Sequence, residues 1–412
     1  MHCKLFYLFL FSLSACGQGS DAPVENVVPA DTIFVGQNII TMERDLTPVS
    51  GLTVRGDEII AVGDADLVLR YRGNATRVVE LGDNALLPGF VDAHGHFSAT
   101  ARLSDFVNLS SPPVGTAENI DDIVRLLQQR IAADQTPAGD WVIGYGYDHS
   151  LLAEQRHPTR DDLGVVSTEH PVLLMHVSGH LAATNSLGLR QSEIDAESSN
   201  PAGGVIRRRE GSREPNGVFE ESAEPYVVDI GTYTYVTALM EEAYVYFVSE
   251  THYDGGIRQI MDIMVSFFSA HTFFWGDWHR LSFGDKCARN ISPTQWAIDN
   301  SLDFTLHNDA PIVPPDMMRL LWASVIRTTR SGHILGPDQR LTVNDALPAM
   351  TLGGAYQFFE EDRKGSLRVG KQADFVILEE NPLLVDPATL KDIEVVETFS
   401  RGRSVFTCTK EH

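Results

Sequence analysis

The chain has 412 residues, of which 43% are hydrophobic and 21% charged, so it can bury a core without the help of disulfides. Its formal net charge of -24 serves solubility and repels phosphate backbones, which excludes nucleic acids as expected partners. The length allows two or three domains, or one α/β barrel of about 250 residues beside a smaller domain.

Residues 1–16 are predicted to direct export. The apolar run from Leu5 to Leu13 is too short for a bilayer span, which needs about 20 residues, but is typical of a signal peptide. The run ends in Leu13-Ser14-Ala15-Cys16, which resembles a bacterial lipobox, so Cys16 is expected to carry lipid; an ordinary secretory signal is the alternative. We therefore expect a tether over residues 17–30 and a chain lipid-anchored to the bacterial cell envelope. The absence of an acidic residue directly after the cysteine favours the periplasmic face of the outer membrane.

Short β-rich runs separated by glycine turns follow the tether and return near the C-terminus. They comprise Thr32–Val35, Leu52–Val54, Glu58–Val62, Phe375–Leu378, Val395–Phe399 and Ser404–Phe406. Because the two ends of a domain commonly meet, we predict one small β-sandwich domain composed of residues 31–84 and 363–407.

Strand-like and helix-like segments alternate between these two ends. Strands are expected at 85–93, 141–144 and 171–175, and helices at 120–133, 317–327 and 343–352, with Asn119 or Asp121 as the N-cap of the first helix. Such alternation is typical of βαβ units around a parallel sheet. We therefore predict an α/β fold in which residues 85–362 form a (β/α)8-type barrel.

The strongest chemical motif is Pro88-Gly89-Phe90-Val91-Asp92-Ala93-His94-Gly95-His96. Side chains two residues apart on a strand point to the same side, so the imidazoles of His94 and His96 can reach one metal ion at a barrel mouth. Two histidines on a polar loop are the alternative, but the hydrophobic run that Pro-Gly introduces favours a metal site.

Later in the chain, other polar side chains follow apolar runs. Asp309 ends the segment Phe304-Thr305-Leu306-His307-Asn308-Asp309, where the alternative is a helix cap before Pro311. His180 and His271 each follow a strand-like run, and His279 lies beside two tryptophans. We consider these three histidines candidates for the substrate pocket; hydrogen-bonded structural histidines and aromatic packing are the alternatives.

Several long motifs carry a resemblance to a known family. They read LLPGFVDAHGH, DWVIGYGYDHSLL, HPVLLMHVSGHLAATNSLGL, SFFSAHTFFWGDWH, FTLHNDAPIVPPDMMRLLWASVIRTTRSG, KGSLRVGKQADFVIL and NPLLVDPATLKDI. Together they resemble the amidohydrolase superfamily, and within it amidohydrolase family 3, the branch that includes N-substituted formamide deformylase-like proteins. The resemblance covers most of residues 31–407, with a gap in the middle.

The resemblance implies a metal-dependent hydrolase barrel with a β-sandwich. It implies His94 and His96 as ligands of a divalent metal, with zinc expected. Asp309 matches the aspartate that the last barrel strand supplies as metal ligand and proton shuttle. A metal ion lowers the pKa of bound water toward about 7, and a nearby carboxylate takes the proton and returns it to the leaving amine.

Part of the family pattern is missing. The family expects a carboxylated lysine on a middle strand, but none of the six lysines follows a middle-strand pattern, and the later motifs H-x-x-G-D and H-A-Q do not occur. Only a short stretch separates Gly256 from Ser266, whereas one βα unit needs roughly 30 residues. We therefore predict an internal deletion around residues 230–265 and an incomplete barrel.

The expected function is hydrolysis of a carbon–nitrogen bond other than a peptide bond, in a small amide-type molecule. The expected membrane contact is through the lipid alone, and no oligomeric state is predicted. The alternative is a catalytically inactive, truncated lipoprotein remnant that acts at most as a binding module. The middle-chain motifs argue against a hydantoinase- or deaminase-like hydrolase.

Overall fold

The computed structural model describes residues 28–43, 45, 48–96, 100, 103, 105–223 and 264–408. The predicted signal peptide, the lipidation site at Cys16 and most of the predicted tether lie outside these residues. Most of the segment in which we predict a deletion lies outside them as well. Within the described ranges, no helix combines the length and the apolar character that a membrane span requires.

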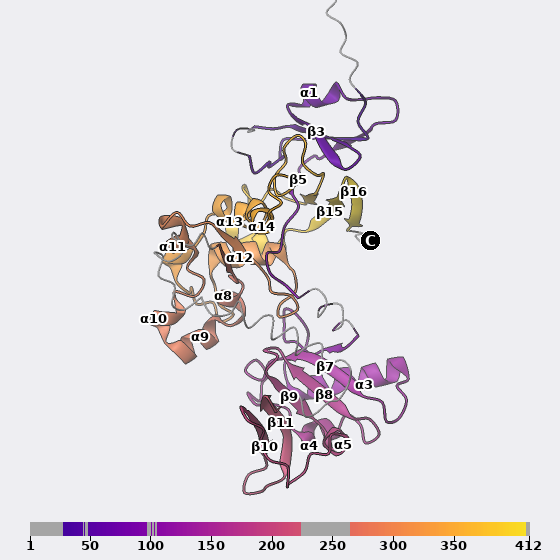
Figure 1. Cartoon of the computed structure of the whole chain (residues 1–412), viewed down its shortest axis with the longest axis vertical. Coiled ribbons are helices and arrows are strands. Elements are labelled where there is room, and N and C mark those ends of the chain that lie inside the picture. Colours follow the sequence, from indigo (N-terminus) through magenta and orange to yellow (C-terminus); the bar gives the residue numbers. More distant parts are fainter. Residues whose placement is uncertain are drawn as a thin grey trace, which may run out of the picture.

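Two four-stranded sheets occupy the ends of the described chain (Figure 1). The first has the order β3-β2-β1-β4 and is formed by β1 (Thr32–Val35), β2 (Gly51–Arg55), β3 (Glu58–Gly63) and β4 (Arg77–Glu80), with helix α1 (Ala65–Leu69) packed on it. The second has the order β16-β15-β14-β5 and is formed by β5 (Ala85–Pro88), β14 (Phe375–Leu378), β15 (Val395–Ser400) and β16 (Arg403–Thr407). All six predicted strands of the two ends are therefore confirmed.

One hydrophobic cluster contains residues of both sheets. The ring of Phe34 in β1 meets the edges of Phe375 in β14 and Phe399 in β15, with centroids 5.0 and 5.4 Å apart. Phe375 and Phe399 stack at 4.6 Å. Phe34 comes from the N-terminal end of the described chain, and Phe375 and Phe399 come from its C-terminal end. Burial of the apolar area of these rings therefore holds the two ends together.

Strand β5 departs from the prediction. The predicted strand 85–93 was assigned to the barrel, but its first part, Ala85–Pro88, pairs antiparallel with β14 and the regular strand ends there. Leu86 packs into the cluster shared by the two sheets, and Leu87 packs into the core of the following α/β region. A strand that is buried on both faces has no polar side, which explains why this run is continuously hydrophobic.

A six-stranded sheet with the order β10-β11-β9-β8-β7-β6 forms a separate part of the fold. Its strands are β6 (Val107–Asn108), β7 (Val142–Tyr147), β8 (Val172–His176), β9 (Leu181–Thr184), β10 (Gly204–Arg208) and β11 (Pro215–Glu221). Strands β6, β7 and β8 are parallel, whereas β8, β9, β11 and β10 pair antiparallel. We call this part the six-stranded region.

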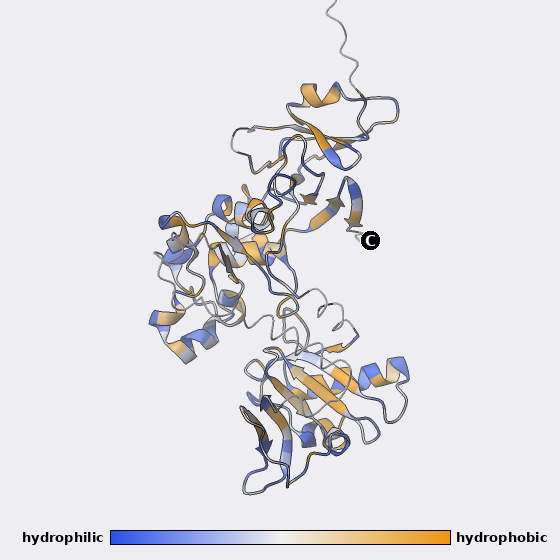
Figure 2. Cartoon of the chain, viewed as in Figure 1, coloured by the Kyte–Doolittle hydropathy of each residue, from blue (hydrophilic) through white to orange (hydrophobic). Residues whose placement is uncertain are grey.

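Helix α3 (Ile120–Asp134) packs on the parallel part of this sheet through Ile123 and Leu127. The side chain of Asn119 accepts a hydrogen bond from the amide of Asp122, so the first of the two predicted caps is the one used. Figure 2 shows hydrophobic residues along β7 and β8, and hydrophobic residues alternating with hydrophilic ones along α3. Two short helices, α4 (Arg160–Gly164) and α5 (Ser186–Gln191), also contact this sheet.

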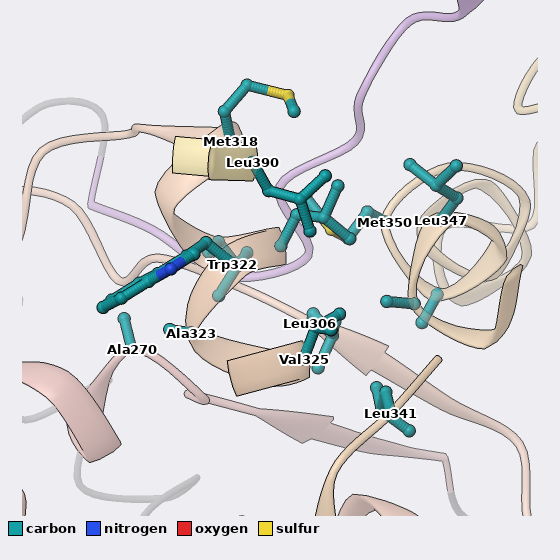
Figure 3. Close-up of a cluster of buried hydrophobic side chains, with 14 of the residues drawn as sticks. Ala270, Leu306, Met318, Trp322, Ala323, Val325, Leu341, Leu347, Met350 and Leu390 are labelled. Carbon is teal, nitrogen blue, oxygen red and sulfur yellow. The ribbon is translucent and has the colours of Figure 1, made fainter. Parts of the chain in front are cut away.

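The third part of the fold contains the parallel pair β12 (Val265–Phe267) and β13 (Phe304–Leu306). Its helices are α8 (His271–Phe274), α9 (Gly276–Phe283), α10 (Asp285–Ala288), α11 (Thr294–Asp299), α12 (Met317–Ile326), α13 (Val343–Ala349) and α14 (Leu352–Gln357), with the 3-10 turns η2 (Pro337–Gln339) and η3 (Pro387–Asp392). One hydrophobic cluster forms its core and includes Trp322 and Ala323 of α12, Leu306 of β13 and Leu347 of α13 (Figure 3). We call this part the β12–β13 region.

The described residues contain parallel strands in two separate sheets, β6–β8 and β12–β13, and no closed eight-stranded sheet. The mixed α/β class is confirmed, as are the predicted strands 141–144 and 171–175 and the predicted helices 120–133 and 317–327. The predicted strand 85–93 ends at Pro88, and the predicted helix 343–352 ends at Ala349, with a second helix beginning at Leu352. Within the described ranges, β12 and β13 pair only with each other.

Candidate metal centre

Main-chain hydrogen bonds fix the segment after β5 beside the loop after β13. The amide of His96 donates to the carbonyl of Ala310 at 2.6 Å, and the amide of Asp309 donates to the carbonyl of His94 at 3.2 Å. Farther back, Val91 donates to Met350 at 2.8 Å. These bonds join parts of the chain more than 200 residues apart and bring both predicted histidines to the predicted carboxylate.

The side chains of His94, His96 and Asp309 converge on one point. The Nε2 atoms of His94 and His96 both lie 3.1 Å from Oδ1 of Asp309, and the two imidazole rings stand nearly perpendicular with centroids 5.1 Å apart. We call these three residues the His94 cluster. Their ligand atoms all lie within 4.8 Å of one another, as the donors around a single metal ion must.

The buried oxygen at the centre of the His94 cluster indicates what the cluster fits. Although two imidazole nitrogens lie close to Asp309 Oδ1, none of the hydrogen bonds of the described residues satisfies this buried atom. A buried acceptor without a donor is costly, whereas a cation would compensate the carboxylate and coordinate both imidazoles. The cluster therefore fits a divalent cation such as zinc better than it fits a purely hydrogen-bonded arrangement.

Electrostatics couple the members of the cluster. Burial alone would raise the pKa of Asp309, but the neighbouring imidazoles of His94 and His96 outweigh it and hold the pKa well below its usual range. The same carboxylate raises the pKa of His94. Asp309 is therefore ionised at neutral pH, which suits both cation binding and proton acceptance.

Asp309 also has an uncommon backbone conformation. Its φ of 58° lies in the left-handed region, which costs a residue other than glycine of order 1 kcal/mol and which aspartate tolerates better than most residues. The bonds from Asp309 to His94 and from His96 to Ala310 hold the turn in place. The strain is thus concentrated where the carboxylate is aimed at the two histidines.

His307 lies beside the cluster and was not among the predicted site residues. Its ring centroid is 5.2 Å from that of His94, and its Nδ1 lies 2.7 Å from Oγ of Ser266 in β12. Burial lowers the pKa of His307 to about 3, so its imidazole is neutral. The sequence feature that could have indicated a site role for His307 is its position two residues before Asp309. The strand before His307 is only three residues long.

Two of the three pocket candidates lie near this site. His271 is partly buried, and burial lowers its pKa to about 3, with further contributions from His279 and His307 and an opposing one from Asp309. The ring of His271 lies 5.3 Å from that of His279 in α9. His279 has a buried Nδ1 with no hydrogen-bond partner among the described residues, and burial lowers its pKa.

The third candidate, His180, lies in the six-stranded region. Its exposed side chain pairs with Glu221 at 3.0 Å, and no described contact joins it to the His94 cluster. The reason is local: His180 precedes β9, which turns back antiparallel to β8 and lies against β11, where Glu221 ends the strand.

The lysine expected from the family pattern does not appear in the described cluster. Lys286 is exposed on α10, and Lys364 pairs with Glu360. Lys371 donates to Ser366, and Lys391 pairs with Asp392. The described ligand set at this site therefore consists of two imidazoles and one carboxylate.

Comparisons with known proteins point to one family. The sequence profile of the amidohydrolase family matches residues 77–247 and 261–406. An N-substituted formamide deformylase from Arthrobacter pascens is 31% identical over 193 residues, which are 47% of this chain and 34% of the relative. The putative amidohydrolase YtcJ of Bacillus subtilis is 27% identical over 197 residues, which are 48% of this chain and 36% of the relative.

A third relative, the exoenzymes regulatory protein AepA of Pectobacterium carotovorum, is 26% identical over 57% of this chain and 50% of its own length. The chain thus spans between 34% and 50% of the length of the curated relatives it matches.

Solved structures show which fold the chain resembles. An uncharacterized metal-dependent hydrolase from Pyrococcus furiosus has a TM-score of 0.55 at 16% identity, over 85% of this chain and 99% of that one. Its counterpart from Pyrococcus horikoshii has a TM-score of 0.51 at 16% identity, over 86% of this chain and 99% of that one. At this identity the likeness establishes the α/β fold of metal-dependent hydrolases and leaves the reaction open.

Proposed function

This chain belongs to the amidohydrolase family, and from that premise we propose that it is a metal-dependent hydrolase of a non-peptide carbon–nitrogen bond in a small amide-type substrate. The observation that carries the proposal is that Nε2 of His94 and Nε2 of His96 both lie 3.1 Å from the buried Oδ1 of Asp309, so that the three ligand atoms can share one ion. The resemblance to an N-substituted formamide deformylase supports N-acyl and N-formyl amines as the first substrates to test.

His94, His96 and Asp309 would hold the ion, for which we propose zinc, because zinc prefers imidazole with a carboxylate and is bound by three protein ligands in many catalytic sites. A bound divalent cation supplies Lewis-acid chemistry, lowering the pKa of water toward about 7 and polarising a carbonyl oxygen. Asp309 would accept the proton of the attacking water and return it to the leaving amine nitrogen. Its ionised state at neutral pH supports the first of these roles.

His271 and His279 would position the substrate. Because His271 is neutral, one of its ring nitrogens carries a proton that can be donated to a carbonyl oxygen as negative charge develops on it. A cavity of about 210 Å³ adjoins this area and is lined by neighbours of both functional segments, among them Ala270 beside His271 and Asn308 beside Asp309. Its small volume favours a small acyl group.

We also propose the predicted organisation around this site: an exported lipoprotein modified at Cys16, a composite β-sandwich, and a barrel shortened by an internal deletion. The family profile matches in two segments, and the unmatched residues 248–260 between them fall within the stretch in which we propose the deletion. A second candidate function follows from the proposed deletion. A shortened barrel without the bridging lysine would be a catalytically inactive remnant that binds at most a small ligand.

Metal content and hydrolysis separate the two candidates. The purified full chain would be analysed for bound metal and assayed against a panel of N-formyl and N-acyl amines. The double variant His94→Ala/His96→Ala would be compared with His333→Ala, which removes an exposed histidine of the β12–β13 region. We expect hydrolysis by the unchanged chain and by His333→Ala, and none by the double variant. Measurable hydrolysis at the same rate in all three proteins would contradict the proposed role of the two histidines. Absence of hydrolysis in all three would favour the inactive remnant.

A further inference from the structure

A second group of metal-ligating side chains lies in the six-stranded region. Asp148 and His149 follow directly after β7, and His176 is the last residue of β8. The two strands are parallel neighbours, with Tyr147 opposite His176 in the register. Because the carboxyl ends of parallel strands meet at one edge of a sheet, the three side chains meet there. We call Asp148, His149 and His176 the His149 cluster.

The ligand atoms of this cluster have the spacing of a coordination sphere. Nδ1 of His149 lies 3.1 Å from Nε2 of His176, and Oδ1 of Asp148 lies 3.9 Å from the same Nε2. Ligands 2.0–2.1 Å from a tetrahedral zinc ion are about 3.3 Å apart. All three atoms lie within 4.8 Å of one another, and Asp148 and His176 are buried.

Neighbouring groups hold each ligand in place. Asp148 Oδ1 accepts hydrogen bonds from the amide and the hydroxyl of Ser150, at 2.9 and 2.6 Å. Asp148 Oδ2 accepts the indole N–H of Trp275 at 3.3 Å. The ring of His149 stacks on that of His157 at 3.9 Å, and Nδ1 of His157 lies 3.1 Å from the hydroxyl of Tyr147. Such surrounding contacts orient metal ligands and tune their affinity.

Ser178 allows His176 to change its tautomer. Its amide donates a hydrogen bond to Nδ1 of His176 at 3.1 Å, and its hydroxyl oxygen lies 2.8 Å from the same nitrogen. When Nδ1 accepts the amide, the ring proton is on Nε2 and points to His149. Cation binding through Nε2 requires the ring proton to move to Nδ1, where the Ser178 hydroxyl accepts it and the bond from the Ser178 amide is lost; the lone pair of Nε2 then faces His149 and Asp148. The second tautomer is the one that binds a cation.

Burial keeps these imidazoles uncharged. It lowers the pKa of His176 to about 4 and that of His157 to about 3, and it lowers the pKa of His149 as well.

From this geometry we propose that Asp148, His149 and His176 bind a divalent cation of the zinc type, as a second metal site distinct from the His94 cluster. Two imidazoles and one carboxylate leave at least one coordination position for water or a ligand. Trp275 connects the two sites, since its indole binds Asp148 and its ring lies 5.2 Å from that of His271. Through Trp275, the second site is therefore linked to the area in which we place the substrate.

The experiment isolates this site by disabling the other one. The full chain with His94→Ala/His96→Ala would be stripped with a chelator and titrated with zinc chloride, and with cobalt(II) chloride to record the visible absorption of bound cobalt. We expect one equivalent of metal to bind in this background. Adding His176→Gln should abolish that binding, and adding Asp148→Asn should weaken it at least about 10-fold.

The matched control is His170→Gln in the same background. His170 is a buried histidine of the same region that bonds to Ser167 and the carbonyl of Thr136, outside the cluster. Circular dichroism would establish that each variant is folded; if His176→Gln is not, the partly exposed His149→Gln and the isosteric Asp148→Asn replace it. The proposal is overturned if the double variant binds no metal, or if the cluster variants bind it as tightly as the control. Neither result depends on hydrolysis, so failure here is distinguishable from failure of the proposed function.

Discussion

The amide of Asn308 donates a hydrogen bond to the carboxylate of Asp92 at 3.1 Å, across 216 residues of sequence. Asp92 precedes His94 by two residues, and Asn308 directly precedes Asp309. The bond therefore joins the two segments that carry the His94 cluster. A second connection between the two segments runs through Gln357, which donates to the carbonyl of Ala93 at 2.9 Å and accepts from the hydroxyl of Thr305 in β13 at 2.8 Å.

Removing the carboxylate of Asp92 should loosen the His94 cluster. We expect Asp92→Ala to lower the affinity of this site for zinc about 10- to 100-fold, as is usual for partners that orient metal ligands. Asp92→Asn keeps an oxygen that can accept from Asn308, so its effect should be smaller. Competition with a chromogenic chelator would measure both, with Asp121→Asn, an exposed carboxylate of α3, as the control. Equal affinity in Asp92→Ala and the control would show that Asp92 has no positioning role.

Asp309→Asn tests the proton transfer when the variant is assayed at a zinc concentration that saturates its metal site. The substitution keeps the shape of the side chain but removes the negative charge that would accept a proton from water. We expect kcat for the best amide substrate to fall about 10²- to 10⁴-fold, the usual contribution of a general base. Asp299→Asn, on the surface of α11, should leave kcat unchanged. Undiminished kcat in Asp309→Asn would remove Asp309 from the reaction.

The sequence predicts local structure and the His94 cluster for a simple physical reason. Alternating or continuous apolar runs specify strands wherever they occur, and two histidines separated by one residue must stay close to each other. Asp309 also ends an apolar run, but it was matched to the two histidines through the resemblance to the amidohydrolase family. His307 was not predicted as a site residue, because its place beside the cluster depends on contacts with Ser266 and His94 that no spacing in the sequence reveals.

The pairing of strands accounts for most of the differences between the structure predicted from the sequence and the observed one. The run that begins at Ala85 is apolar throughout, and only its antiparallel pairing with β14 shows that its first part belongs with the β-rich ends. His180 follows a strand, as a pocket residue would, but the antiparallel return of β9 directs it to Glu221. Asp148 and His149 lie within a quoted motif, yet their proximity to His176 depends on the register of β7 with β8.

Asp162 should make the stability of the six-stranded region depend on pH. Burial would raise its pKa, but hydrogen bonds from Arg156 and Thr159 outweigh burial and lower the pKa to about 2. Since the pKa of an unfolded aspartate is about 3.9, the ionised carboxylate stabilises the fold fully above that value. This stabilisation is lost as the pH falls from about 4 to about 2.

Asp162→Asn measures this contribution. Asp162 caps the first turn of α4 together with Thr159, and losing such a cap costs about 0.5–2 kcal/mol. We expect the free energy of unfolding in urea to drop by that amount at pH 7 and the difference from the unchanged chain to shrink toward pH 2. A difference that stays constant between pH 7 and pH 3 would contradict the assigned ion pair. Asp161→Asn, on the exposed side of the same helix, is the matched control.

Arg327 ends α12 and is the largest fully buried side chain of the described residues. Its guanidinium donates to the carbonyls of Leu335 at 2.8 Å, Ser292 at 2.9 Å and Ile291 at 2.7 Å. Burial lowers its pKa to about 10, so it remains charged at neutral pH. The carbonyls it binds belong to the loops that pack against α12, so this one side chain fixes the end of the helix to both.

Arg327→Lys should therefore destabilise the β12–β13 region although it preserves the charge. An ammonium group cannot reproduce the planar fork, so at least one buried carbonyl loses its donor, at about 1.5–3 kcal/mol for a hydrogen bond to a charged group. Urea unfolding followed by tryptophan fluorescence reports on this region, because Trp322 lies on the same helix. Arg289→Lys, which changes an exposed ion pair with Asp338, should shift the free energy of unfolding by less than about 0.5 kcal/mol. If the two variants unfold at the same urea concentration, the guanidinium of Arg327 does not hold the end of α12.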